Sequence, residues 1–169
     1  MRAGYYSIVF GLVISVLVNH TLTAQITESH ERILAEAVDQ ALMQLQKPRC
    51  AEIFGASAPG ALRTANFRFI SLGKTQFDRT GRFFVANAKT ILSARMIVIN
   101  LDGSFVNPKL MSGRLGSDFG LTPVKYRALI LLHELGHLVG VFKPDVGIAD
   151  PTSNERSRQY SAMIRSKCF

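Results

Sequence analysis

One short sequence near the C-terminal end, His-Glu-Leu-Gly-His at residues 133–137, constrains the fold more than any other feature of the chain. Apolar runs flank it at residues 128–132 and 138–142. Such a pattern predicts a helix that is apolar nearly all round and is therefore buried. Ionisable side chains on a buried helix are costly unless they are paired or bind a metal. The fold must therefore cover this helix and provide partners for its histidines and its glutamate.

The spacing of these residues is typical of a zinc site. Side chains four residues apart lie on one face of a helix, about 40° apart round its axis. His133 and His137 can therefore direct two imidazole nitrogens at one ion. Glu134 lies about 100° from His133 and can reach water at that ion. Two neutral imidazoles suit zinc, with the glutamate as general base rather than ligand, so we expect zinc here. The alternative is a cluster of paired side chains without a metal.

The ends of this helix are also readable in the sequence. Thr122 is a good N-cap, and Pro123 falls at the first helical position, where its missing N–H costs nothing. Gly140 is placed to end or bend the helix. We therefore predict a helix over residues 123–139. Gly136, inside it, suggests close packing by a neighbouring segment, because a helix-interior glycine is otherwise unfavourable.

On these residues, the stretch 121–142 resembles the active-site helix of the zincin metallopeptidases. The resemblance implies a zinc-dependent peptidase in which Glu134 activates a zinc-bound water for attack on a peptide bond. It also implies a zincin-like fold. The longer metzincin pattern would have a third histidine at residue 143, but this chain has Lys143, whose ammonium has no lone pair to donate. In its length and in having one cysteine toward each end, the chain also resembles small secreted bacterial proteins of this kind.

The third zinc ligand is left open by the sequence. An open zinc site needs three protein ligands, and three carboxylates follow the motif. Asp145 is the first candidate because it follows the Gly140 bend, although its neighbours are typical of a turn. Glu155 is the runner-up, similar in placement to the second-helix glutamate of gluzincins, although it also fits a helix capping box. Asp150 is the third candidate.

Two further questions concern the kind of site. Tyr160 and Tyr126 are candidates for stabilising an oxyanion, and the sequence assigns the role to neither. The competing class is a non-catalytic exported binding or toxin-like module with a structural zinc, which would need a fourth protein ligand. His30 is the histidine available for that role.

Residues 1–24 have the pattern of a secretory signal peptide: Arg2, an apolar core over residues 8–18 and small residues up to Ala24. Its core is too short for a membrane span. We therefore expect an extracytoplasmic protein with one domain over residues 25–169.

The chain has two cysteines, Cys50 and Cys168. In an oxidising compartment we expect them to form a disulfide. The alternatives are two free buried thiols or a Cys/His metal site, for which the usual spacing is lacking.

The net charge of +8 is spread along the chain. No aromatic-basic run and no helix-turn-helix pattern favours nucleic acid. We expect a solvated basic surface, a monomer, no membrane span after signal cleavage, and a peptide or protein substrate.

The fold class predicted is α+β. An apolar face at helical spacing predicts a first helix over residues 26–47, ended by Pro48. Alternation of apolar and polar residues, or a short apolar run, predicts strands over residues 66–72, 82–86 and 96–101. A small-residue loop is expected over residues 56–60, and a closing helix over 152–166. Either of the last two strands is a candidate for the sheet edge that holds peptide by strand addition.

Overall fold

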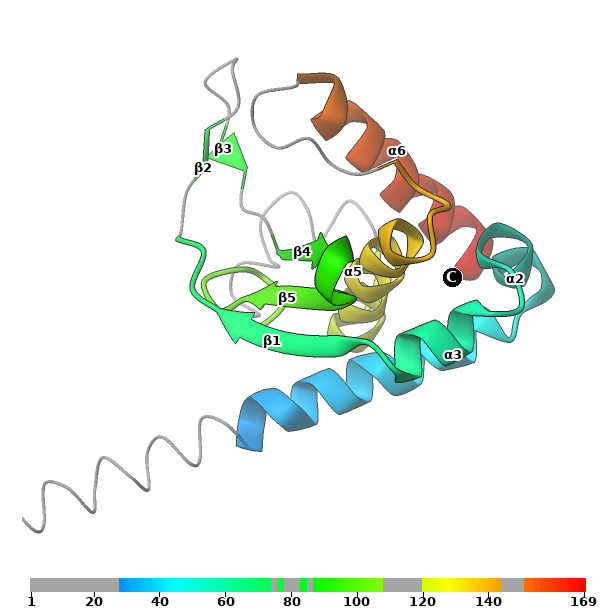
Figure 1. The fold of residues 1–169 in the computed structure, drawn as a ribbon, viewed down its shortest axis with the longest axis horizontal. Coiled ribbons are helices and arrows are strands. Elements are labelled where there is room, and N and C mark those ends of the chain that lie inside the picture. The colour runs from blue at the N-terminus through cyan, green and yellow to red at the C-terminus, as the bar shows by residue number, and fades with distance from the viewer. Residues whose placement is uncertain (1–27, 74–75, 78–82, 85–86, 108–119, 144–150) are drawn as a thin grey trace, which may run out of the picture. The chain divides into compact units, whose positions relative to one another are not determined.

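The computed structural model describes residues 28–73, 76–77, 83–84, 87–107, 120–143 and 151–169. The expected signal peptide lies outside these residues. The fold is α+β, as the sequence predicts (Figure 1). Residues 36–169 form one compact unit, and the described residues before them, 28–35, belong to a second unit.

The first helix covers residues 28–45, close to the range predicted. Ala37, Ala41 and Leu45 are its buried apolar side chains, at the i, i+4, i+8 spacing of one helix face. The helix ends before Pro48, which starts helix α2 (Pro48–Phe54) at a position where proline is tolerated. Pro48 therefore separates two helices.

Helix α3 (Ala58–Arg63) replaces most of the loop expected over residues 56–60, so that prediction was wrong. The local sequence is poor in helix formers, with Pro59 and Gly60 in the first turn. Burial of Ala58 and Leu62, both 0% exposed, stabilises the helix instead. Tertiary packing is the usual source of stability for so short a helix.

The main sheet has three strands in the order β1-β5-β4. Strand β1 (Asn66–Ile70) pairs in parallel with β5 (Met96–Asn100), and β4 (Ala88–Ile91) pairs with β5 in antiparallel register. A 3-10 turn over Leu92–Ala94 joins β4 to β5. Arg95 follows the turn at φ 46°, a left-handed conformation that ends it.

Two features of the sheet differ from the sequence prediction. Strand β5 is central, with β1 and β4 on either side, so of the two candidates for the peptide-holding edge this one was wrong. Strand β4 was not predicted, because four residues with a lysine among them give a weak alternation signal. Strands β2 (Gln76–Phe77) and β3 (Phe83–Phe84) form a separate two-stranded sheet, which includes part of the predicted strand 82–86.

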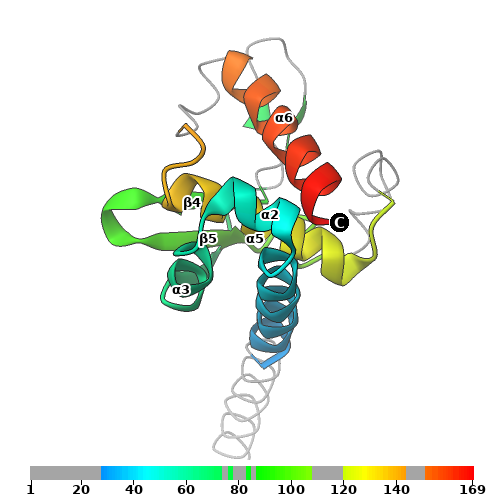
Figure 2. The ribbon, with the colours of Figure 1, turned by 90° about the vertical axis from the view of Figure 1, so that its right-hand side faces the viewer.

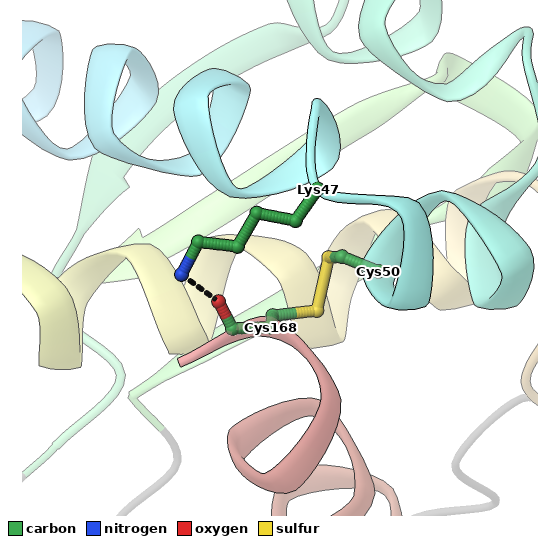
Figure 3. The surroundings of a disulfide bond; sticks show 3 residues. All are labelled: Lys47, Cys50 and Cys168. Carbon is green, nitrogen blue, oxygen red and sulfur yellow. Dashed lines mark hydrogen bonds between the residues drawn. A yellow bond between two sulfur atoms is a disulfide. The ribbon is translucent and has the colours of Figure 1, made fainter.

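Helix α5 (Pro123–Leu138) lies beside β4, and helix α6 (Pro151–Cys168) packs on α5 (Figures 1 and 2). The last residues of α6 also contact α2. There Cys50 and Cys168 form the expected disulfide, with their Cα atoms 4.7 Å apart. Lys47 Nζ donates a hydrogen bond of 2.7 Å to the carbonyl oxygen of Cys168 (Figure 3). The end of α6 is therefore fastened to α2 by a covalent bond and a hydrogen bond.

None of the helices in the described part of the chain is both long and apolar enough to cross a membrane.

Candidate metal centre

Helix α5 carries the motif within the predicted bounds. It starts after Thr122, with Pro123 in its first turn, and ends at Leu138 with Gly140 at φ 77° two residues on. The Thr122 side chain makes no capping hydrogen bond, so the start depends on the backbone conformation and on proline. All five motif residues are buried. The expectation of a buried motif helix is therefore confirmed.

The two histidines of the motif converge at their Nε2 atoms. Nε2 of His133 lies 3.1 Å from Nε2 of His137, and the two side chains are only 6% and 5% exposed. Two nitrogens bound to one tetrahedral zinc at 2.0–2.1 Å are about 3.3 Å apart. The spacing of the pair therefore fits two of the ligands of a zinc ion with little rearrangement.

The carboxylate of Glu134 is held by strand β4. Thr90 Oγ1 lies 2.7 Å from Oε2 of Glu134 and 3.0 Å from its backbone carbonyl oxygen. The single hydroxyl hydrogen of Thr90 can serve either acceptor. Because Glu134 is only 7% exposed, this contact supplies a polar partner that a buried carboxylate needs. No local sequence pattern marks Thr90, because its contact with Glu134 depends on the position of β4 beside α5.

Aromatic rings cover the histidine pair. Phe142 has its ring centroid 5.9 Å from those of both histidines and stacks on Tyr160 at 4.1 Å. Tyr160 is 6.2 Å from each histidine ring. This candidate oxyanion residue therefore lies near the pair, on helix α6.

Gly136 explains how Phe142 comes so close. A Cβ at this position would overlap the Cδ2 and Cε2 atoms of the Phe142 ring. The backbone N–H of Phe142 also donates to the carbonyl oxygen of Gly136 at 3.0 Å. The packing reason expected for this glycine is thereby confirmed, and the segment involved is the chain that turns back just after α5.

Tyr126 belongs to a different environment. Its hydroxyl lies 3.0 Å from Ser104 Oγ and 3.4 Å from Asn87 Nδ2. Burial raises the pKa of Tyr126, and the hydrogen bonds from Ser104 and Asn87 oppose that shift. The Tyr126 hydroxyl is therefore hydrogen-bonded to these two residues.

Helix α6 places two serine hydroxyls beside His133. Ser161 Oγ is 3.1 Å from Nδ1 of His133, and Ser157 Oγ is 3.4 Å from Nε2. No local sequence pattern marks these two serines. Only the packing of α6 on α5 brings them to the motif.

Of the three carboxylates considered as third ligand, only Glu155 is among the described residues; Asp145 and Asp150 lie outside them. Glu155 is 57% exposed, and its carboxylate lies 3.2 Å from Arg158 and 3.4 Å from Gln159 on the same helix. It is two residues before Ser157, about 160° round the helix from the face toward His133. Over the described ranges, no group of three His, Cys, Asp or Glu side chains is arranged to hold a metal.

A shallow pocket of about 500 Å³ lies between α3 and the end of α5. It is lined by residues of α3, by Arg95 and by Leu138 and Val139. The motif residues do not line it.

No family model matches the chain, and no curated protein or solved structure matches it either.

Proposed function

We propose that this protein is a zinc-dependent metallopeptidase of zincin type. The observation that carries the proposal is the 3.1 Å approach of the His133 and His137 Nε2 atoms, with Glu134 next to His133 on the same buried helix. That constellation supplies two imidazole nitrogens and one carboxylate in a place shielded from bulk water. These are two of the three protein ligands and the general base that hydrolysis of a peptide bond by a zinc site needs.

When bound, zinc would polarise the scissile carbonyl and lower the pKa of water at the site toward about 7. Glu134 then acts as the general base, taking a proton from the attacking water and returning it to the leaving amine. Thr90 orients this carboxylate, since its hydroxyl lies 2.7 Å from Oε2. Tyr160 is the candidate for stabilising the oxyanion, because it lies beside both histidine rings.

The substrate proposed is an extended peptide that adds to strand β4. Among the described strands, β4 pairs with β5 alone, which leaves its other edge open to a further strand. Thr90, on β4, contacts Glu134, so this strand lies beside the motif. A peptide paired with β4 would run past the general base with its backbone exposed.

For the third ligand we propose Asp145, with Asp150 as an alternative. The exposed position of the Glu155 side chain on α6 supports Asp145 and Asp150 over this runner-up.

We also propose export from the cytoplasm, guided by the signal-like residues 1–24. The Cys50–Cys168 disulfide supports this proposal, because such bonds persist in oxidising compartments. The mature chain would begin at or near Gln25, which an intact mass of the exported protein tests.

One observation favours a second candidate, a non-catalytic module with a structural zinc. Phe142, Tyr160 and α6 cover the histidine pair, and a closed, covered site is typical of structural zinc. This alternative requires a fourth protein ligand.

A comparison of wild type with Glu134→Gln separates the two candidates. Both proteins should retain about one zinc per chain, because the residue is not a ligand. Peptide hydrolysis should fall about 100-fold or more in the variant, since a positioned general base contributes about 10²–10⁴ in rate. Hydrolysis of a degenerate peptide pool, with and without a zinc chelator, measures this. Equal cleavage by both proteins, or cleavage that resists the chelator, contradicts the peptidase; zinc retention without any cleavage supports the structural site.

A further inference from the structure

Two serines of α6 bracket the imidazole of His133. Ser161 Oγ lies 3.1 Å from Nδ1, and Ser157 Oγ lies 3.4 Å from Nε2. Four residues separate the serines, so they lie on one face of α6. Nε2 of His137 also lies on this side, 3.1 Å from Nε2 of His133. The two ring nitrogens therefore have different surroundings: the hydroxyl of Ser161 lies at Nδ1, and His137 and the hydroxyl of Ser157 lie at Nε2.

We infer that Ser161 is a positioning residue for the metal centre, which accepts a hydrogen bond from Nδ1–H of His133 and so directs the Nε2 lone pair toward His137. A neutral imidazole has one N–H and one acceptor nitrogen. An acceptor at Nδ1 therefore fixes which nitrogen keeps its lone pair. A metal-binding histidine usually donates its other ring N–H in this way. The inference rests on the proposed function and adds a residue that lies outside the motif.

The contact between the two histidines agrees with this tautomer. With Nδ1 of His133 protonated, its Nε2 is an acceptor, so His137 donates from Nε2 across the 3.1 Å contact in the metal-free protein. With zinc in place, both Nε2 atoms instead present lone pairs to the ion. Ser161 keeps the same role in both states.

The position of Ser161 is set by the buried face of α6. Ile164 and Cys168, three and seven residues further on, are each 0% exposed. Cys168 is also bonded to Cys50 on α2. These anchors fix the rotation of α6 about its axis, and with it the direction of the Ser161 hydroxyl. A hydroxyl on such a fixed element can orient a ring.

The test begins with zinc affinity, measured by competition with a chelator. Ser161→Ala should bind zinc about 10–100-fold more weakly than wild type, the usual effect of losing an outer partner of a metal ligand. Ser161→Thr, which keeps the hydroxyl, should restore most of the affinity. Ser166→Ala, on an exposed position of the same helix, is the matched control and should bind as wild type does. Thermal unfolding of each variant establishes that it is folded.

Nitrogen-15 NMR of the imidazoles in the metal-free protein gives a readout that a merely structural serine would not change. Wild type and Ser161→Thr should have His133 protonated at Nδ1, and Ser161→Ala should shift toward a mixture of tautomers. Protonation of wild-type His133 at Nε2 overturns the inference, and so does an affinity loss in Ser161→Ala with no change of tautomer. If wild type fails to retain zinc, the proposed function fails, and the tautomer measurement still decides the role of Ser161.

Discussion

Thr90 and Glu134, 44 residues apart in the chain, meet with Oγ1 2.7 Å from Oε2. This contact joins the edge strand β4 to the motif helix α5. It also means that the carboxylate proposed as general base is oriented by the strand proposed to hold the substrate. The side chain of Thr90 thereby links the proposed peptide-binding strand to the orientation of the Glu134 carboxylate.

Thr90→Val should lower kcat for peptide hydrolysis by about tenfold, with KM and zinc content little changed. Valine keeps the shape of threonine but removes the hydroxyl, so the buried carboxylate loses a hydrogen bond of the kind that contributes about 1.5–3 kcal/mol. Steady-state kinetics and metal analysis measure the two effects. Thr90→Ser should retain most of the activity.

Thr64→Val is the control for hydroxyl removal in general. Thr64 is exposed and bonds only to carbonyl oxygens of its own helix among the contacts seen. Its substitution should leave kcat unchanged. An equal loss of activity in the Thr64 and Thr90 variants would contradict the orienting role of Thr90.

Gly136→Ala should destabilise the protein by about 1–3 kcal/mol, because the new methyl group overlaps the Phe142 ring. This outweighs the gain of about 1 kcal/mol in helix propensity. Phe142 has little room to move, since it also packs against Phe54 and Tyr160. Urea unfolding measures the change.

Gly60→Ala is the matched helix substitution. No heavy atom lies within 4 Å of the Cβ that it would add. We expect it to stabilise the protein by about 0.5 kcal/mol, because alanine lowers the conformational entropy of the unfolded chain. If both glycine variants are more stable than wild type, that result contradicts the close packing of Phe142 on Gly136.

Asp145→Ala should weaken zinc retention by orders of magnitude if Asp145 is the third ligand, because two remaining protein ligands are easily stripped by a chelator. Glu155→Ala should bind zinc within a few-fold of wild type, since its carboxylate lies with Arg158 at the surface. The loss of that exposed ion pair should change stability by less than about 1 kcal/mol. Zinc dissociation constants of the two variants and of Asp150→Ala identify the ligand, and a large loss in Glu155→Ala alone would reinstate the runner-up.

Removal of the disulfide by Cys50→Ser with Cys168→Ser should lower the free energy of unfolding by about 2–5 kcal/mol, because the bond closes a loop with a separation of 118 residues. Zinc affinity should fall as well, since α6 then loses its anchor to α2. Ser157 and Ser161 would be held less firmly beside His133. Unfolding curves and chelator competition on the same preparation measure both quantities. Unchanged zinc affinity in a folded variant would show that α6 stays in place without the bond.

The sequence was sufficient for features that depend on local chemistry. The bounds of α5 follow from Pro123 and Gly140, and the histidine pair follows from helical spacing, which puts residues four apart on one face whatever surrounds them. With only two cysteines in the chain, Cys50 could pair only with Cys168. Each of these inferences uses rules that hold within a few residues or depend on residue type alone.

Only the tertiary structure decided what surrounds the motif. Thr90 reaches Glu134 because β4 pairs with β5 and lies beside α5, and Ser161 reaches His133 because α6 packs on the same helix. Helix α3 forms against a poor local sequence because burial of Leu62 stabilises it. Contacts between residues 28 and 44 positions apart have no local signature, since they depend on how whole elements pack together. Helical spacing therefore determined which side chains of the motif share one face of α5, and packing determined the partners that hold them in place.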